Sequence, residues 1–508
     1  MFYSSLANSN EQPKGPIADA FRQFINNELP PCLIDTSHLQ FISRKDVFGV
    51  FQDQIAGVTE DQIKERIGRF RSDPLASYQP QRSAVLRQVI QEIVQYVILS
   101  HRWDEIGGEP TSWDISGGKR YVARFKKLSQ FCKTSRKLGY KLAWVDTCCI
   151  DQTSMAELSE AIHEMYKWYA NAYLCIVYLA ESTSCADWLA DSWFTRGWTL
   201  QELLAPKRVK FYDKNWQPFI PSGVIDDRKS DGVIDTLENV TGISKAVLAA
   251  DNSCGVQGRT FWEVMSWASK RQTTRTEDKA YSLIGLFDVS LAIAYGEGQR
   301  AFPRLLEAIS AKDPSWDILA WSGQPSVYHF ALPSSPASYS RFETCAGEDR
   351  VGVRNFTITA YGLSLRSLPV IPVDPCSVIV PERAGKPFLV NLKPRYGTLQ
   401  RFSNLVVECG ATRLKTIRGA RQLSACIINH HATGSRERGK LMFGREYICF
   451  LLYSEEEDGD DETVWTNISK LTLYLSRDHR FLPRPSSAQH CLVCHSLGNP
   501  IGTLSFGC

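Results

Sequence analysis

The sequence predicts an α/β protein whose central sheet is parallel and flanked by helices. Three observations lead to this fold class. Short continuous apolar runs, typical of strands buried on both faces, recur in the first half of the chain. Amphipathic helical patterns separate these runs, and this alternation implies right-handed crossovers between parallel strands. Polar residues follow the runs where such strands would end. The runs are residues 96–100, 142–146, 174–179 and 208–212.

The helices between these strands are predicted from apolar residues that recur in steps of three and four. The first follows a Gly-rich loop and ends near Gly139, where a helix cap is expected. The second runs from about residue 155 to 169. The residues that form the two apolar faces are Val122, Phe125, Leu128, Phe131, Leu158, Ile162, Met165 and Tyr169.

Composition excludes several classes of protein. The chain has 508 residues, 43% hydrophobic and 22% charged, with a formal net charge of +3. This near-neutral balance argues against a nucleic-acid partner. No apolar run approaches the roughly 20 residues that span a bilayer. The first residues resemble no secretory signal, and the 15 cysteines are an odd number. We therefore expect reduced thiols and a cytoplasmic location.

Changes in pattern along the chain divide it into four expected segments. Residues 1–90 read as a helical lead-in, and 91–215 as the α/β core. Residues 216–325 are mostly helical and extend that core. Residues 326–508 carry β-branched and aromatic runs between polar turns, which predict a separate β-rich domain. The runs begin at Phe356, Pro387, Tyr447 and Leu471.

The predicted topology brings three distant segments to one place. In open α/β sheets, ligands bind beyond the carboxyl ends of the strands. Residues 100–104 and 146–152 follow the first two strands, and the segment 193–206 comes before the fourth. We expect Ser100, Asp146 and Glu202 to meet at that edge.

The segment WFTRGWTLQELLAP, residues 193–206, supplies the candidate acid. Trp198 and Glu202 are four residues apart, so a helix places them on one face. Pro206 ends the helix, and Arg196 supplies a cation beside the acid. Burial and neighbouring charge would tune the pKa of such a carboxyl group. The alternative is a structural helix with Leu200 and Leu203 in the core and Glu202 solvated.

Other motifs carry no chemistry in this interpretation. The spacing of Cys491, Cys494 and His495 fits haem attachment, but that chemistry requires export, so we take the match as chance. Arg275, Glu277 and Asp278 are expected to form a structural salt-bridge network. We predict no metal site.

The sequence blocks LSHRW (99–103), WVDTCCIDQ (144–152) and RGWTLQELLAP (196–206) resemble the three signatures of the fungal heterokaryon-incompatibility (HET) domain. Two further blocks, at 266–289 and 295–309, extend the resemblance over about residues 96–321. Family members often carry tyrosine at the position of His101, so we assign His101 no essential role. The resemblance implies a protein of fungal non-self recognition, a form of innate immunity that ends in programmed cell death.

The HET domain is similar to the Toll/interleukin-receptor (TIR) fold, which implies a TIR/flavodoxin-like sheet. TIR enzymes cleave NAD with a glutamate in a Trp-Cys-x-x-Glu-Leu pattern, and Trp198 to Leu203 resembles it with Thr199 in place of cysteine. The resemblance thus suggests Glu202 as the catalytic residue of an NAD nucleosidase, with NAD as substrate and no bound cofactor.

The remaining candidate residues would surround the substrate. Trp103 and Trp198 could wall the pocket or simply pack in the core. Asp146 and Asp151 could contact ribose or cap a helix. Arg196 could hold a phosphate or pair with Glu202. The rival interpretation is a non-enzymatic module that signals by self-association or by binding another incompatibility protein.

Overall fold

The computed structural model describes residues 12–70, 78–103, 108–116, 125–220, 223–250, 259–313, 315–319, 321, 326–329 and 332–340, and strand backbones between 356 and 504. The chain divides into two compact units, residues 1–257 and 258–508. Each is described here by itself. Among the described residues, no helix is both long and apolar enough to cross a membrane.

The first unit contains a six-stranded sheet in the order β2-β1-β4-β3-β5-β6. Four of its strands, β4, β3, β5 and β6, pair in parallel. Their positions agree with the four apolar runs of the sequence. The strands are β1 Cys32–Asp35, β2 Gln40–Ser43, β3 Tyr96–His101, β4 Leu142–Trp144, β5 Leu174–Tyr178 and β6 Val209–Tyr212.

The prediction of a wholly parallel sheet was wrong at one edge. Strands β1 and β2 form an antiparallel hairpin, and β1 also pairs antiparallel with β4. The sheet is therefore mixed, and its extra strands come from the segment that was expected to be helical only. Each has four residues, and β1 buries only Leu33 and Ile34. Such a run is too short to show the alternation that identifies a half-buried strand.

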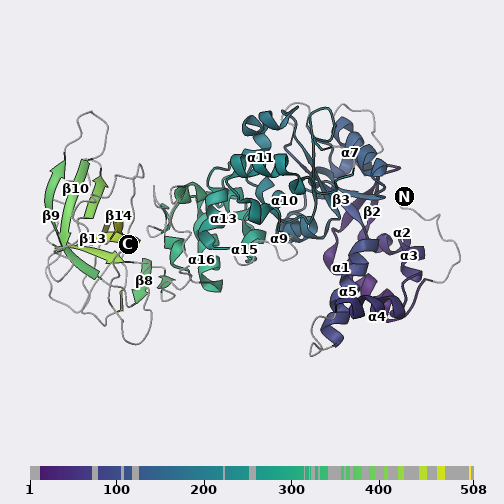
Figure 1. The fold of residues 1–508 in the computed structure, drawn as a ribbon, viewed down its shortest axis with the longest axis horizontal. Coiled ribbons are helices and arrows are strands. Elements are labelled where there is room, and N and C mark those ends of the chain that lie inside the picture. Colours follow the sequence, from purple (N-terminus) through teal and green to yellow (C-terminus); the bar gives the residue numbers. More distant parts are fainter. Residues whose placement is uncertain are drawn as a thin grey trace. The chain divides into compact units, whose positions relative to one another are not determined.

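Helices surround this sheet (Figure 1). The strand order shows that the chain moves from β3 to β4 in one direction and returns past β3 to reach β5. Right-handed crossovers then put α7 and α9 on opposite faces. The main helices are α1 Pro16–Glu28, α4 Glu60–Phe70, α5 Tyr78–Ile93, α7 Phe125–Lys137, α9 Met155–Asn171, α10 Thr199–Leu204 and α11 Asp231–Thr241.

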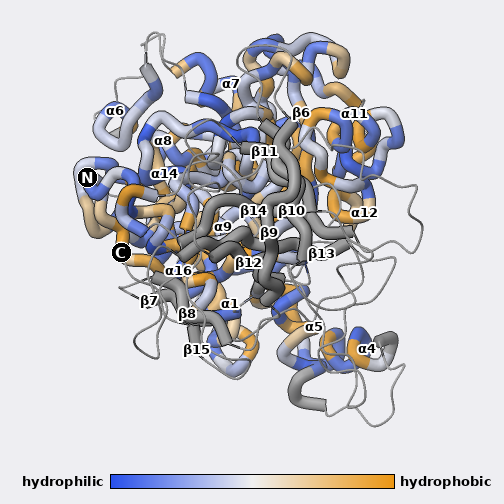
Figure 2. The backbone as a smooth tube through the Cα atoms, turned by 90° about the vertical axis from the view of Figure 1, so that its left-hand side faces the viewer, coloured by the Kyte–Doolittle hydropathy of each residue, from blue (hydrophilic) through white to orange (hydrophobic). Residues whose placement is uncertain are grey.

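Aromatic side chains hold α9 against the sheet. The ring of Trp144 in β4 lies 5.7 Å from that of Trp168 and 6.0 Å from that of Tyr169. The hydroxyl of Tyr169 donates to the carbonyl of Leu99 in β3 at 2.9 Å. Along α4 and α11, hydrophobic and hydrophilic residues alternate (Figure 2), as in helices with one face in the core.

The segment 193–206 is not one helix. A 3-10 turn, η3 (Ser192–Thr195), is followed by an extended Arg196 and then by α10. The hydroxyl of Thr199 lies 2.6 Å from the carbonyl of Trp193 and 2.9 Å from that of Arg196. The hydrogen bonds of Thr199 stabilise the interruption between η3 and α10. Because of this interruption, the side chains of Trp193 and Glu202 both point to β3.

In the second unit, the described helices are α13 Phe261–Ala268, α14 Asp278–Tyr281, α15 Ile284–Phe287 and α16 Ala301–Lys312. One carboxylate oxygen of Glu277 accepts the N–H groups of Gly296 (2.8 Å) and Gly298 (3.0 Å). Tyr295 donates to Asp278 at 2.8 Å. These contacts tie a loop to α14, which is a structural role, but they are hydrogen bonds and not the salt bridges predicted for this cluster.

Further along, the strands that the structure describes form two antiparallel sheets, of order β11-β10-β9-β12-β13-β14 and β15-β8-β7. A separate β-rich domain here remains a prediction. The Cys491–His495 motif lies outside the described residues. The strands are β7 Phe356–Thr359, β8 Gly362–Arg366, β9 Val370–Ile379, β10 Phe388–Pro394, β11 Leu405–Cys409, β12 Gln422–Ile427, β13 Glu446–Ser454, β14 Thr466–Tyr474 and β15 Thr503–Leu504.

Candidate functional site

Three distant segments meet at the carboxyl edge of the parallel strands, where the chain changes direction between β3 and β5. Ser100 lies near the end of β3, Glu202 lies in α10, and Asp146 begins the short helix α8, Asp146–Cys149. The hydroxyl of Ser100 donates to Oε2 of Glu202 at 2.6 Å. Such switch points are where ligands bind in open α/β sheets.

The direction of this hydrogen bond is fixed by Trp193. Its indole Nε1 lies 2.8 Å from Oγ of Ser100. An indole N–H can only donate, so the hydroxyl hydrogen of Ser100 remains for Glu202. Trp193, Ser100 and Glu202 thus form a directed chain of hydrogen bonds.

Glu202 is a buried acid with a perturbed proton affinity. Its exposed fraction is 2%. Burial raises the pKa of Glu202 to about 7; the nearby charge of Asp146 also raises it, whereas Arg196 and the hydroxyls of Ser100 and Tyr169 lower it. A carboxyl group that titrates near neutral pH can serve as a general acid or base.

Asp146 has the opposite character, although it is also buried. Its Oδ2 accepts from Nε1 of Trp103 at 2.8 Å, and its Oδ1 lies 3.3 Å from Nε2 of His101. Burial alone would raise the pKa of Asp146, but His101, Arg196 and Trp103 together hold it below its ordinary value. Two carboxyl groups with pKa values pushed apart are typical of sites that divide acid and base roles.

Contacts with His101 and Trp103 hold Arg196 at this site. Its Nη1 donates to the carbonyl of His101 at 2.6 Å, and its guanidinium carbon lies 5.4 Å from the ring centre of Trp103. Trp103 is 39% exposed, so the pair stands at the surface of the site. The positive charge of Arg196 lowers the pKa of Glu202 and of Asp146.

Two of the predicted residues contribute differently from the others. The carboxylate of Asp151 accepts from the N–H (2.9 Å) and the hydroxyl (2.6 Å) of Thr153, which makes it a local loop cap. Trp198 is half-buried at the start of α10, and its carbonyl accepts the N–H of Glu202 at 3.4 Å. The geometry joins Ser100, Trp103, Asp146, Arg196 and Glu202, but gives Asp151 other partners.

Sequence reasoning missed His101 and Trp193. His101 was set aside because the related proteins often carry tyrosine there, yet it is 1% exposed and faces Asp146. Its place at the end of a buried strand was the available signal. Trp193 gave none, because its partner is 93 residues away and becomes apparent only when α10 is docked beside β3.

Some buried polar atoms of the site have unused hydrogen-bonding capacity. Nε2 of His101 and Oδ1 of Asp146 lie 3.3 Å apart and face each other, whereas Nδ1 of His101 has no hydrogen-bond partner among the atoms that the structure describes. Buried polar groups are nearly always satisfied, so this nitrogen points to a water or a ligand group. No cluster of potential metal ligands occurs among the described residues.

Comparisons with known proteins agree with the resemblance in the sequence. Residues 96–190 match the family described as Heterokaryon incompatibility protein (HET). Over 235 residues, the chain is 39% identical to vegetative incompatibility protein HET-E-1 of Podospora anserina. This match covers 44% of the chain but only 16% of that relative. No solved structure matches the chain.

Proposed function

We propose that this chain, which matches the HET family over residues 96–190, acts in heterokaryon incompatibility, the fungal non-self recognition that ends in programmed cell death. The family match and the relative support this proposal. We place its action in the cytoplasm, with self-association or another incompatibility protein as its trigger.

We further propose that the first unit is TIR-like. The parallel strands of this unit, numbered along the chain, follow the spatial order 2-1-3-4. That order agrees with the flavodoxin-like arrangement, whose ligands bind at the switch between the first and third strands. The candidate site occupies the corresponding edge.

The proposed reaction is hydrolysis of NAD at its N-glycosidic bond. The bond between nicotinamide and the ribose breaks, nicotinamide leaves with the bonding electrons, and water forms the new bond to the ribose carbon. A proton is released, and the other product is ADP-ribose. The transition state has oxocarbenium character, which a nearby carboxylate can stabilise, as in glycoside hydrolysis.

One observation carries this proposal: Glu202 is a buried carboxyl group, with a pKa of about 7, at the switch point of the sheet. In its ionised form Glu202 would stabilise the charge on the ribose. The unpaired Nδ1 of His101 and the carboxylate of Asp146 would meet the ribose hydroxyls. Arg196 would bind the diphosphate, and Trp103 would lie along the flat nicotinamide ring.

A second function is favoured by a different observation. Glu202 is only 2% exposed and already accepts a hydrogen bond from Ser100. A carboxyl group satisfied in this way could simply hold α10 against β3. The unit would then be an assembly module that signals by oligomerisation, without catalysis.

The two functions are separated by incubating the purified full chain with NAD and measuring nicotinamide and ADP-ribose. The key variant is Glu202→Gln, which keeps the size and an acceptor oxygen for Ser100. The matched control is Glu164→Gln, an acid on α9 that pairs with Lys167 near the surface. Unchanged circular dichroism would show that both variants fold.

Turnover that is lost in Glu202→Gln and kept in Glu164→Gln is the result we expect. The assay includes the chain fused to a domain that forces oligomers, because TIR-type sites are often completed by a neighbouring subunit. Absence of turnover in both the free and the oligomeric chain would exclude the hydrolase and leave the assembly module.

A further inference from the structure

The first unit has a pocket at the edge of the sheet opposite the candidate site. Its volume is about 210 Å³, and Tyr173 and Arg208 in its wall directly precede β5 and β6. Those positions lie at the amino ends of the parallel strands, whereas Ser100 and Glu202 lie at the carboxyl edge. The pocket is therefore distinct from the site of the proposed reaction.

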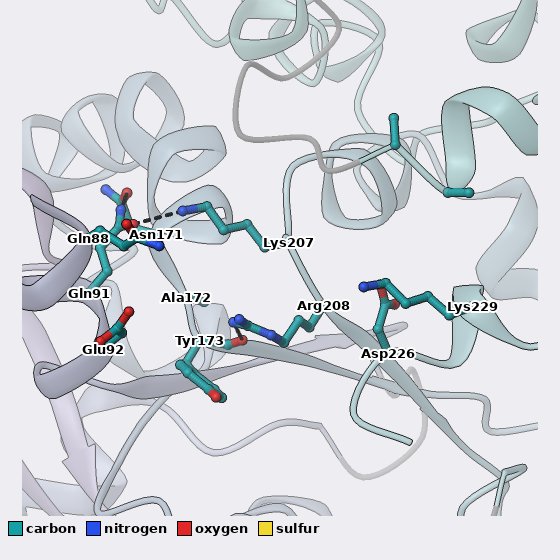
Figure 3. A pocket seen from close by; sticks show the side chains of 12 residues that line it. Gln88, Gln91, Glu92, Asn171, Ala172, Tyr173, Lys207, Arg208, Asp226 and Lys229 are labelled. Carbon is teal, nitrogen blue, oxygen red and sulfur yellow. Dashed lines mark hydrogen bonds between the residues drawn. The ribbon is translucent and has the colours of Figure 1, made fainter. Parts of the chain in front are cut away.

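Three cationic side chains line this pocket. Lys207, Arg208 and Lys229 surround the same open space (Figure 3). Lys207 donates to the neutral amide oxygen of Gln91 at 2.7 Å. The guanidinium of Arg208 stacks over Tyr173 at 4.3 Å and donates to its carbonyl at 3.3 Å. In the described part of the chain, neither Arg208 nor Lys229 has a carboxylate partner.

The two acids of the lining are neutralised by arginines that are not part of it. Asp226 accepts from the buried Arg228 at 3.0 Å. Glu92 accepts from Arg66 at 2.7 Å. With both acids paired in this way, the charges of Arg208 and Lys229 are in excess, so the electrostatic potential in the pocket favours an anion.

Size and stacking narrow the class of anion. Pockets for drug-sized ligands are typically about 300–1,000 Å³, so this one fits a smaller molecule than a dinucleotide. One face of Tyr173 is covered by Arg208, and its ring also packs 5.3 Å from that of Tyr140. These contacts leave little of the ring for a nucleobase. Several cations around one space suit a doubly charged group with many acceptor oxygens, which is phosphate.

We infer that this pocket is a binding site for a small phosphate-bearing anion, held by Arg208 and Lys229 with Lys207 at its side. The competing explanation is that these cations only complement the carboxyl ends of α5 and α9, which also border the pocket. In that case their loss would change stability but no ligand would bind.

The test is calorimetric titration of the full chain with inorganic phosphate at constant ionic strength. Arg208→Gln should weaken binding by about tenfold, the effect of losing one charge-assisted hydrogen bond. Lys229→Gln should also weaken it, and this exposed side chain carries little risk of misfolding. The control is Lys214→Gln, which removes the same charge beyond the other end of β6.

Binding that falls in the first two variants and not in the control supports the site. Equal weakening in all three, or no binding to the native chain, would overturn it. Ribose 5-phosphate forms a second arm: tighter binding than inorganic phosphate identifies a phosphate ester as the ligand, and weaker binding identifies free phosphate. No NAD is present, so the outcome is independent of the proposed hydrolase.

Discussion

The hydroxyl of Ser100 and the carboxylate of Glu202 lie 2.6 Å apart although 102 residues separate them in the sequence. Ser100 is fully buried and is also the acceptor for Trp193. This one side chain therefore links a central strand, a 3-10 turn and the helix that carries the candidate acid. Substitution of Ser100 therefore measures how much these hydrogen bonds contribute to the free energy of unfolding.

Removal of this hydroxyl should destabilise the first unit. Ser100→Ala leaves buried polar atoms of Glu202 and Trp193 unpaired, at a cost of about 1–3 kcal/mol. The effect should be smaller in Glu202→Leu, which has no acceptor oxygen for the hydroxyl of Ser100. Urea unfolding of both single variants and the double variant measures this coupling. A coupling energy of zero would mean that the two side chains do not interact.

The pH dependence of stability should reveal Glu202. Its pKa is raised from 4.5 to about 7, so between these values the folded state binds more protons than the unfolded state. Stability therefore falls as pH rises through this window, by up to about 3 kcal/mol, and the loss persists above it.

Glu202→Gln lacks this titration. Its stability relative to the native chain should rise from pH 4.5 to pH 7 and then level off. The measurement is the difference in the midpoint of thermal unfolding between the two proteins at several pH values. A difference that stays constant across the window would show that Glu202 titrates as an ordinary surface acid.

Arg228 should be required for the placement of α10. It is 1% exposed, pairs with Asp226 at 3.0 Å and donates to the carbonyls of Leu203 and Lys207 at 3.4 and 2.8 Å. Arg228→Met leaves a buried carboxylate and these carbonyls without their partner, which should cost about 3–5 kcal/mol.

Arg228→Met combined with Asp226→Asn removes the uncompensated charge as well, so it should recover part of the loss. Chemical unfolding of the three proteins tests this. If Arg228→Met were as stable as the native chain, the pair of Arg228 and Asp226 would not be stabilising the position of α10.

Substitution of Asp151 is expected to leave the activity almost unchanged. Its carboxylate caps Thr153 and is exposed, so Asp151→Asn should leave kcat/KM for NAD within about twofold of the native value. Asp146→Asn, by contrast, removes a carboxylate that contacts His101 and Trp103, so it should lower kcat/KM for NAD strongly. A large loss in the Asp151 variant would mean that its loop moves into the site.

Strands that form long continuous apolar runs could be predicted from the sequence. Contacts that form only when distant elements pack together could not. Tyr96 to Leu99 is a continuous apolar run, and its burial on both faces follows from that pattern alone. The hairpin Cys32–Ser43 was missed because its strands are short. The break before α10 was missed because Thr199 can cap a turn as well as continue a helix.

The same division holds for the site. Ser100, Asp146 and Glu202 follow from the rule that parallel strands end at one edge. Trp193 and His101 depend on side-chain directions that no spacing in the sequence encodes. Asp151 shows the reverse, since it stands close to Asp146 in the sequence but the turn after α8 directs it to Thr153.

The directed chain from Trp193 through Ser100 to Glu202 also bears on how the gene can be cut for expression. A fragment that stops with the family match at residue 190 keeps Ser100 but discards both of its hydrogen-bonding partners. It also discards β6, which leaves β5 as an unpaired edge open to other chains. Fragments meant to isolate this sheet therefore need to extend beyond Tyr212, because an exposed edge at β5 favours aggregation.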